Sequence, residues 1–129
     1  PNEVQEIERP DVLIIEGINT LQLPSSEQIY VSDFTDFSIY VDARPKLIEE
    51  WYLERFKALL KLAENDPDNY YHSYTKMPLK DAVEEAKSIW FNVDLPNLED
   101  YILPTRSRAN MIIHKGEQHI IDQVMLRKS

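Results

Sequence analysis

A single carboxylate, Glu16, follows an unbroken apolar run in the segment DVLIIEGIN, residues 11–19. Runs of this kind are typical of strands that are covered on both faces, as in parallel sheets. Ligands of open α/β sheets bind at the carboxyl ends of the strands, where a carboxylate suits a magnesium ion held through water. From spacing alone, a solvated acid at a strand end is an equally good interpretation of Glu16.

Arg55 interrupts an apolar stripe that runs through the segment WYLERF, residues 51–56. Tyr52, Arg55, Phe56 and Leu59 follow one another at helical steps, which places them on one face of a helix. An arginine that leans inward needs an anion, and its rigid fork matches the oxygens of a phosphate group. The pattern alone favours the alternative, in which the stem covers apolar surface while the guanidinium reaches water.

Three tyrosines, Tyr70, Tyr71 and Tyr74, form a second cluster. Each offers an apolar ring with a polar tip, which is what the wall of a ligand pocket requires. Composition alone favours the simpler interpretation, in which these rings pack between two helices.

The chain has only two glycines, Gly17 and Gly116, so it contains neither G-x-x-x-x-G-K-[ST] nor G-x-G-x-x-G. Any cradle for a triphosphate must therefore come from residues outside this chain. His114, Lys115 and His119 form a small late cluster whose spacing does not indicate a zinc site.

The hydrophobic periodicity predicts the elements that carry these residues. Strands are expected at 11–19, 36–43, 109–115 and 120–128, the last with a helix as alternative. Helices are expected over 46–64 and from Pro78 to Trp90, a loop around residues 24–26, and irregular chain or a short helical turn over 95–105. This order predicts an α/β fold with a mainly parallel sheet flanked by helices.

The composition places the chain in the globular class and narrows its partners. Its 129 residues, 43% of them hydrophobic, suffice for a single domain over 1–129 with a modest core. The net charge of −9 argues against binding to nucleic acid or to an anionic membrane surface. With no cysteine, no signal-peptide pattern and no apolar run long enough to cross a bilayer, we expect a soluble cytoplasmic protein.

Several segments together resemble the C-terminal part of bacterial type I pantothenate kinase, over nearly the whole chain. They are PDVLIIEGIN, VSDFTDFSIYVDA, WYLERF, DPDNYYHSY, NLEDYILPTRSRA and LRK, in family order and spacing. The resemblance implies a partial P-loop kinase fold whose N-terminal phosphate-loop half lies outside this chain. It also implies transfer of the γ-phosphoryl group of ATP to pantothenate with magnesium, the first committed step of coenzyme A biosynthesis, and feedback inhibition by coenzyme A.

The resemblance also implies roles for individual residues. Arg55 matches the catalytic arginine at the transferring phosphate, and Glu16 matches the acid near the magnesium. Lys115 and His119 match residues beside the adenine. The pantothenate side is matched by Tyr52, which contacts the substrate, and by an aromatic wall that also surrounds the pantetheine arm of coenzyme A: Phe56, Tyr70, Tyr71 and Tyr74.

Two positions depart from the family pattern. Asp94 stands where the family typically has an asparagine hydrogen-bonded to pantothenate, and an ionised aspartate only accepts hydrogen bonds. Because pantothenate is an anion, we expect either a different contact or weaker binding at Asp94. Leu59 stands where some members carry phenylalanine, so we expect the wall to differ there.

Three further expectations follow. The chain alone should not phosphorylate pantothenate, because the phosphate cradle is missing. The uncovered edge and faces of the first strand should promote homo-oligomers. The rival functions are another P-loop kinase, acting on uridine or phosphoribulose, and a non-catalytic binding module built from the same helices.

Overall fold

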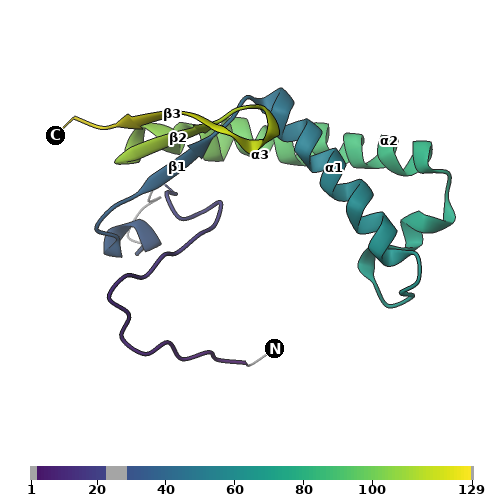
Figure 1. Ribbon diagram of the computed structural model, residues 1–129, viewed down its shortest axis with the longest axis horizontal. Helices are drawn as coiled ribbons and strands as arrows, with labels where there is room; N and C mark the ends of the chain where they lie inside the picture. Colours follow the sequence, from purple (N-terminus) through teal and green to yellow (C-terminus); the bar gives the residue numbers. More distant parts are fainter. Residues whose placement is uncertain (1–2, 23–28, 129) are drawn as a thin grey trace.

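The computed structural model describes residues 3–22 and 29–128, which form a small three-stranded sheet and a pair of long helical segments (Figure 1). The strands are β1 (Ile39–Asp42), β2 (Met111–Lys115) and β3 (Ile121–Leu126), in the order β1-β2-β3. β1 runs parallel to β2, and β3 returns antiparallel to β2 as a hairpin. The strands expected at 36–43, 109–115 and 120–128 are thus confirmed. The mainly parallel sheet is not, since one of its two pairings is antiparallel.

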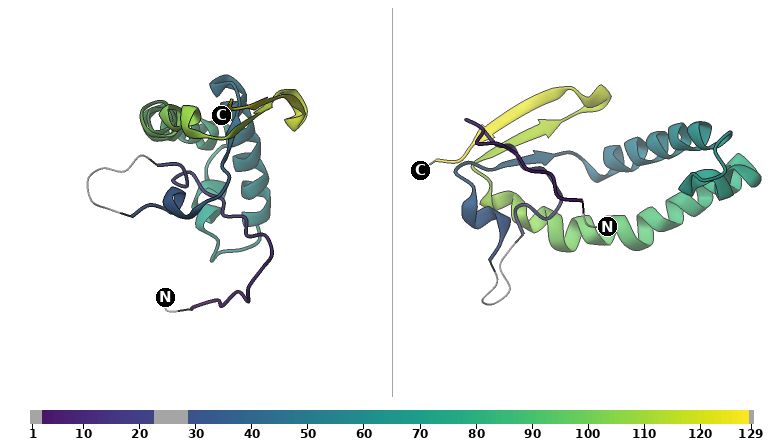
Figure 2. Two further views of the ribbon diagram at one scale, coloured as in Figure 1. Left: turned by 90° about the vertical axis from the view of Figure 1, so that its left-hand side faces the viewer. Right: turned by 90° about the horizontal axis from the view of Figure 1, so that it is seen from below.

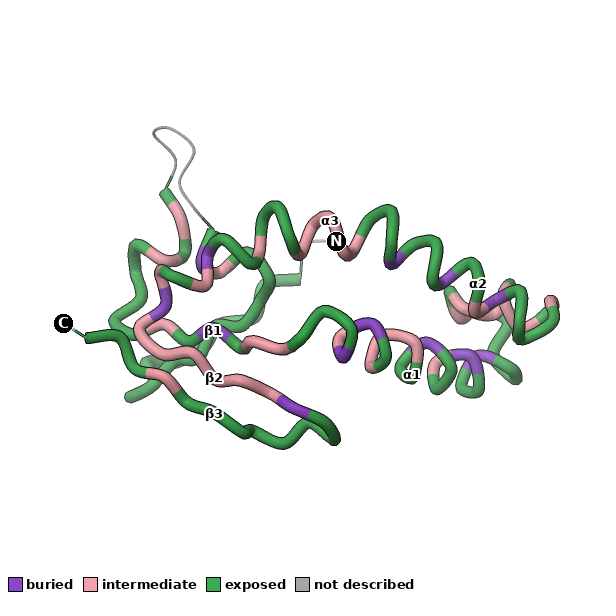
Figure 3. The backbone as a smooth tube through the Cα atoms, turned by 90° about the horizontal axis from the view of Figure 1, so that it is seen from above, coloured by how far each residue is buried: buried purple, intermediate pink, exposed green. Residues whose placement is uncertain are grey.

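Helix α1 (Pro45–Ala63) and helix α2 (Leu79–Ile89) lie side by side beyond the sheet (Figures 1 and 3). Both coincide with the expected helices. Pro45 occupies the first turn of α1, where the missing N–H has no helical partner to lose. The helices bury a shared apolar cluster, Phe56 and Leu60 from α1 with Ala82 and Ala86 from α2. The small alanines allow the two helices to approach closely.

The helical path continues after α2 to residue 108, where irregular chain or a single turn was expected over 95–105. Its parts are wide π turns at Trp90–Asp94 and Leu98–Ile102, the short helix α3 (Leu95–Asn97) and a 3₁₀ helix at Leu103–Arg108. The prolines explain the irregular windings, because proline cannot donate the helical hydrogen bond. The N–H of Leu95, next to Pro96, reaches back five residues to the carbonyl of Trp90. The helical hydrogen bonds next to proline thus span five residues instead of four, and the backbone stays helical.

The strand expected at 11–19 is absent. Residues 12–15 have no regular structure, and Val12 and Ile14 are 77% and 86% exposed. A strand covered on both faces needs partner strands and covering layers, and within the described residues β1 is the edge of the sheet. Among the described residues, no strand or helical layer covers the apolar run as its composition predicts. The loop expected around residues 24–26 lies outside the described residues.

The end of this segment is nevertheless fastened to the sheet. Leu21 is buried against Tyr40 of β1 and Ala109, which precedes β2. The guanidinium of Arg108 donates hydrogen bonds to the carbonyls of Leu21 and Gln22, at 2.7 and 2.8 Å. Figure 2 shows the segment passing beside the sheet before it runs outward toward the N-terminus. In the part of the chain that the structure describes, no helix is long and apolar enough to cross a membrane.

Candidate functional site

An aromatic cluster fills the space between α1, the following 3₁₀ helix (Tyr70–Lys76) and α2. It consists of Tyr52, Phe56, Tyr71 and Tyr74 around the buried residues that α1 and α2 share. The ring of Phe56 meets Tyr71 and Tyr74 edge-on, with centroids 6.1 and 5.6 Å apart. Edge-to-face contacts of this kind fix the relative orientation of the rings. The structure thus brings together four of the five aromatic residues assigned to the pantothenate side.

The fifth, Tyr70, lies at the rim of this cluster. Its ring is edge-on to Tyr71 at 5.2 Å, but the residue is 79% exposed. Two contacts hold the 3₁₀ helix in place. Asn69 caps it by accepting a hydrogen bond from the N–H of Tyr71 (2.9 Å), and the Nδ1 atom of His72 lies 2.8 Å from the Ala63 carbonyl at the end of α1.

Tyr52 connects the aromatic cluster with Asp94. Its ring lies 5.6 Å from that of Trp90, at the start of the π turn that ends with Asp94. Burial raises the pKa of the Tyr52 hydroxyl, and the nearby Asp94 carboxylate raises it further. Burial also raises the pKa of Asp94 itself. Asp94 is therefore near the aromatic cluster, in surroundings that stabilise its ionised form less well than water does.

A second group of assigned residues gathers around Trp51, one residue before Tyr52. The His119 ring stacks on the Trp51 indole, with centroids 4.3 Å apart and planes 22° apart. The Lys115 ammonium lies 5.1 Å from the centroid of the indole. These two residues, which the resemblance places beside the adenine, thus share one aromatic platform. Sequence reasoning missed this role of Trp51 because its stripe of apolar residues on α1 does not reveal which partner covers each residue.

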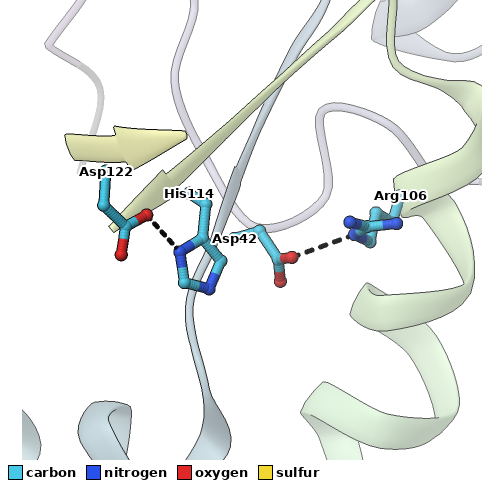
Figure 4. A network of polar contacts seen from close by, with 4 residues as sticks. All are labelled: Asp42, Arg106, His114 and Asp122. Atoms are coloured by element: carbon cyan, nitrogen blue, oxygen red, sulfur yellow. Dashed lines mark hydrogen bonds and ion pairs between the residues drawn. The ribbon is translucent and has the colours of Figure 1, made fainter. Parts of the chain in front are cut away.

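A polar network lies at the carboxyl ends of β1 and β2 (Figure 4). Asp42 forms an ion pair with Arg106 (3.0 Å), and His114 Nδ1 lies 2.6 Å from a carboxylate oxygen of Asp122. Asp42 and His114 are register partners in the parallel pair, so their side chains share one face. Sequence reasoning noted His114 but assigned neither residue to a network, because the partners Arg106 and Asp122 lie far along the chain or across a turn.

The network fastens the sheet to its neighbours. Arg106 ties the carboxyl end of β1 to the helical segment that precedes β2, and Asp122 ties the two strands of the hairpin together. A Cβ atom on Gly116 would lie 2.5 Å from a carboxylate oxygen of Asp122, so glycine permits this close approach. Burial, and secondarily Asp42, raises the pKa of the nearby Tyr40 hydroxyl, while Arg106 partly offsets this.

Arg55 and Glu16 are placed differently from the expectation. Arg55 is exposed on α1 rather than buried within the apolar stripe, as the alternative interpretation expects. Glu16 is exposed in irregular chain rather than at a strand end. Among residues 3–22 and 29–128, no three metal-ligating side chains come together.

Curated relatives cover almost the whole of this chain, although no family model matches it. A pantothenate kinase of Enterococcus faecalis is 62% identical over 126 residues, 98% of this chain and 41% of the relative. Pantothenate kinases of Levilactobacillus brevis and Streptococcus agalactiae are 61% and 56% identical over 128 residues, 99% of the chain and 42% of each relative. The resemblance is thus confirmed, and the chain spans about two fifths of the length of these relatives.

Proposed function

We propose that this chain is part of an ATP-dependent pantothenate kinase and that it supplies the acceptor pocket and one catalytic arginine. The observation that carries the proposal is the identity of 62% to a protein named pantothenate kinase across 98% of the chain. Because the chain lacks a phosphate-binding loop, the rest of the kinase, of P-loop type, supplies the cradle for the triphosphate.

The aromatic cluster is the proposed acceptor pocket. The partly buried Tyr52, Tyr71 and Tyr74, packed around the buried Phe56, would offer ring surface to the carbon skeleton of pantothenate, and their hydroxyls would offer hydrogen bonds to its polar groups. Tyr70, exposed at the rim, is positioned to meet a longer ligand. The pantetheine arm of coenzyme A contains the pantothenate skeleton, so coenzyme A would inhibit by occupying the same wall.

Arg55 is the proposed catalytic residue. Its exposure leaves the guanidinium accessible to a phosphate group, and it lies one residue before Phe56, beside the acceptor pocket. During in-line transfer of the phosphoryl group to a pantothenate hydroxyl, a positive charge there stabilises the negative charge on the moving oxygens. Lys115 and His119, on Trp51, would contact the adenine of ATP. Glu16 would lie near magnesium only together with ligands from outside the described residues.

A competition assay on the full-length gene product tests the proposal against the nearest rival. We expect phosphate transfer from ATP to pantothenate that excess uridine does not inhibit. Preferential transfer to uridine or phosphoribulose would assign the protein to the rival kinases. No transfer to any of these acceptors would favour the non-catalytic module. The 129-residue chain, assayed in parallel, should give no turnover above background.

Replacement of Asp94 by asparagine is expected to lower the KM for pantothenate about three- to tenfold at neutral pH, equivalent to ~1 kcal/mol. The change removes a negative charge from the anion's pocket and restores a donor. Burial raises the pKa of Asp94. As the pH falls, Asp94 therefore becomes protonated earlier than an exposed aspartate would. The advantage of the variant should therefore shrink as the pH falls. Steady-state kinetics of both proteins across pH would measure this, and a constant ratio of KM values would contradict the argument.

We also expect the 129-residue chain to self-associate. Residues 12–15 are exposed, and on β1 the residues Ile39 and Val41 are 48% and 59% exposed. A strand edge with apolar neighbours invites pairing with another copy. Light scattering should show a mass that rises with concentration, and a monomer of constant mass across the millimolar range would refute this.

A further inference from the structure

Trp51 stands where two parts of the proposed kinase meet, and no role has been assigned to it. Its indole contacts His119 and Lys115 of the β2–β3 hairpin (residues 111–126), more than sixty residues later in the chain. Within the residues that the structure describes, each ring contact between this hairpin and α1 involves Trp51. The indole is thus the aromatic joint between hairpin and helix.

The backbone of the hairpin turn is unusual at the residue that Trp51 holds. Gln118 and His119 have φ angles of 55° and 60°, in the left-handed region that residues with a side chain rarely adopt. Two successive positive φ angles in a hairpin turn favour asparagine and glycine. The turn is closed by hydrogen bonds from Ile120 N–H to the Glu117 carbonyl (3.1 Å) and from Gly116 N–H to the Ile120 carbonyl (2.8 Å). A strained position that carries an imidazole instead of glycine points to use of that side chain.

The stack also fixes the hairpin relative to the residues of the acceptor side. Trp51 and Arg55 are four residues apart on α1 and lie on the same face, while Tyr52, next in sequence, faces the aromatic cluster. Within the hairpin, the pair of His114 with Asp122 links β2 to β3. Movement of His119 relative to α1 would therefore change its distance from Arg55.

We propose that Trp51 is a positioning residue for the nucleotide: it holds the His119 imidazole and the Lys115 ammonium in place for a planar base and keeps them in register with Arg55. This inference rests on the proposed function, because it takes ATP as the ligand. The His119 ring, exposed at the turn, offers a flat surface to a base. The Lys115 ammonium, attracted by the indole face, adds a hydrogen-bond donor beside it.

Three variants of the full-length gene product test this role. Trp51→Leu removes the aromatic surface and Trp51→Phe keeps it, while Tyr101→Leu makes the same kind of change at a residue that is 73% exposed and has no assigned role. We expect Trp51→Leu to raise the KM for ATP about tenfold. An aromatic stack contributes free energy equivalent to at most about a tenfold change in affinity. The KM for pantothenate should stay within about twofold, because the acceptor wall is formed by other residues.

The conservative variant and the control decide between positioning and general damage. Trp51→Phe should bring the KM for ATP back to within about threefold of the parent value, and Tyr101→Leu should leave both constants unchanged. The inference is overturned if Trp51→Leu leaves the KM for ATP unaffected, if it raises both constants equally, or if phenylalanine fails to restore binding. Equal thermal midpoints for the two Trp51 variants would confirm that unfolding does not cause the difference.

The outcome for Trp51 can be separated from that for the proposed function. If the gene product transfers no phosphate to pantothenate, the proposed function fails. Calorimetric titration with ADP would still measure how the Trp51 variants change the affinity for a nucleotide. Trp51→Leu should then bind ADP about tenfold more weakly than Trp51→Phe. Equal affinities of these two variants, or no ADP binding by the parent protein, would overturn the role of Trp51.

Discussion

If Arg55 has the proposed catalytic role, its replacement by alanine is expected to lower kcat of the proposed full-length kinase by about a thousandfold, the smaller end of what an arginine at a moving phosphoryl group contributes. Arg55 is exposed on α1 next to the buried Phe56, so its removal leaves the packing of the helix intact. The loss should appear in kcat with little change in the KM for pantothenate, because the charge acts as the phosphoryl group leaves ATP.

Two companion variants sharpen this result. Arg55→Lys keeps the charge but loses the planar fork, so its kcat should fall between those of the parent and the alanine variant. Lys57→Ala removes another exposed cation from α1 and should keep kcat within about twofold, because the proposed mechanism assigns it no role. If Arg55→Ala retained more than about a tenth of the parent kcat, the catalytic role would be excluded.

Replacement of Phe56 by alanine is expected to lower the free energy of unfolding by about 3–5 kcal/mol. Phe56 is only 7% exposed and contributes to the cluster shared by α1 and α2, with Tyr71 and Tyr74 edge-on to its ring. Its removal leaves a cavity and takes away both ring contacts. Urea unfolding of the 129-residue chain, followed by far-UV circular dichroism, would measure the loss.

A matched change on the exposed side of the same helix provides the control. Leu62 is 71% exposed, so Leu62→Ala should alter the free energy of unfolding by no more than about 0.5 kcal/mol. Phe56→Leu keeps most of the buried area and should lie between the two. A cost below about 1 kcal/mol for Phe56→Ala would show that the aromatic cluster is not a core of this protein.

The helices were predictable because the information for them is local. For each helix, the apolar stripe and the proline near its start lie within about twenty consecutive residues. Both helices occur where they were expected. The strands at 36–43 and 109–115 were predictable for the same reason. The local pattern failed at 95–105, because wide helical turns let the backbone pass Pro96 without leaving the helix.

The failures have a common cause in partners that a single sequence does not display. Residues 12–15 have the composition of a buried strand, but burial depends on layers that the described residues do not provide. Arg55 shares a helical face with apolar residues, yet the residue is exposed. Trp51 and Asp42 were missed because their partners, His119 and Arg106, are brought close only by the folded chain.

The central claim is that the aromatic cluster is the acceptor pocket. An NMR titration that follows the tyrosine ring signals of the full-length gene product tests this claim most directly. With ring signals assigned by single Tyr→Phe variants, addition of pantothenate should shift those of Tyr52, Tyr71 and Tyr74, which surround Phe56. The signal of Tyr101, 73% exposed on another part of the chain, should not move. Saturable shifts confined to the three cluster tyrosines are the result that we predict. No shift, or shifts at Tyr101 with none in the cluster, would contradict the account.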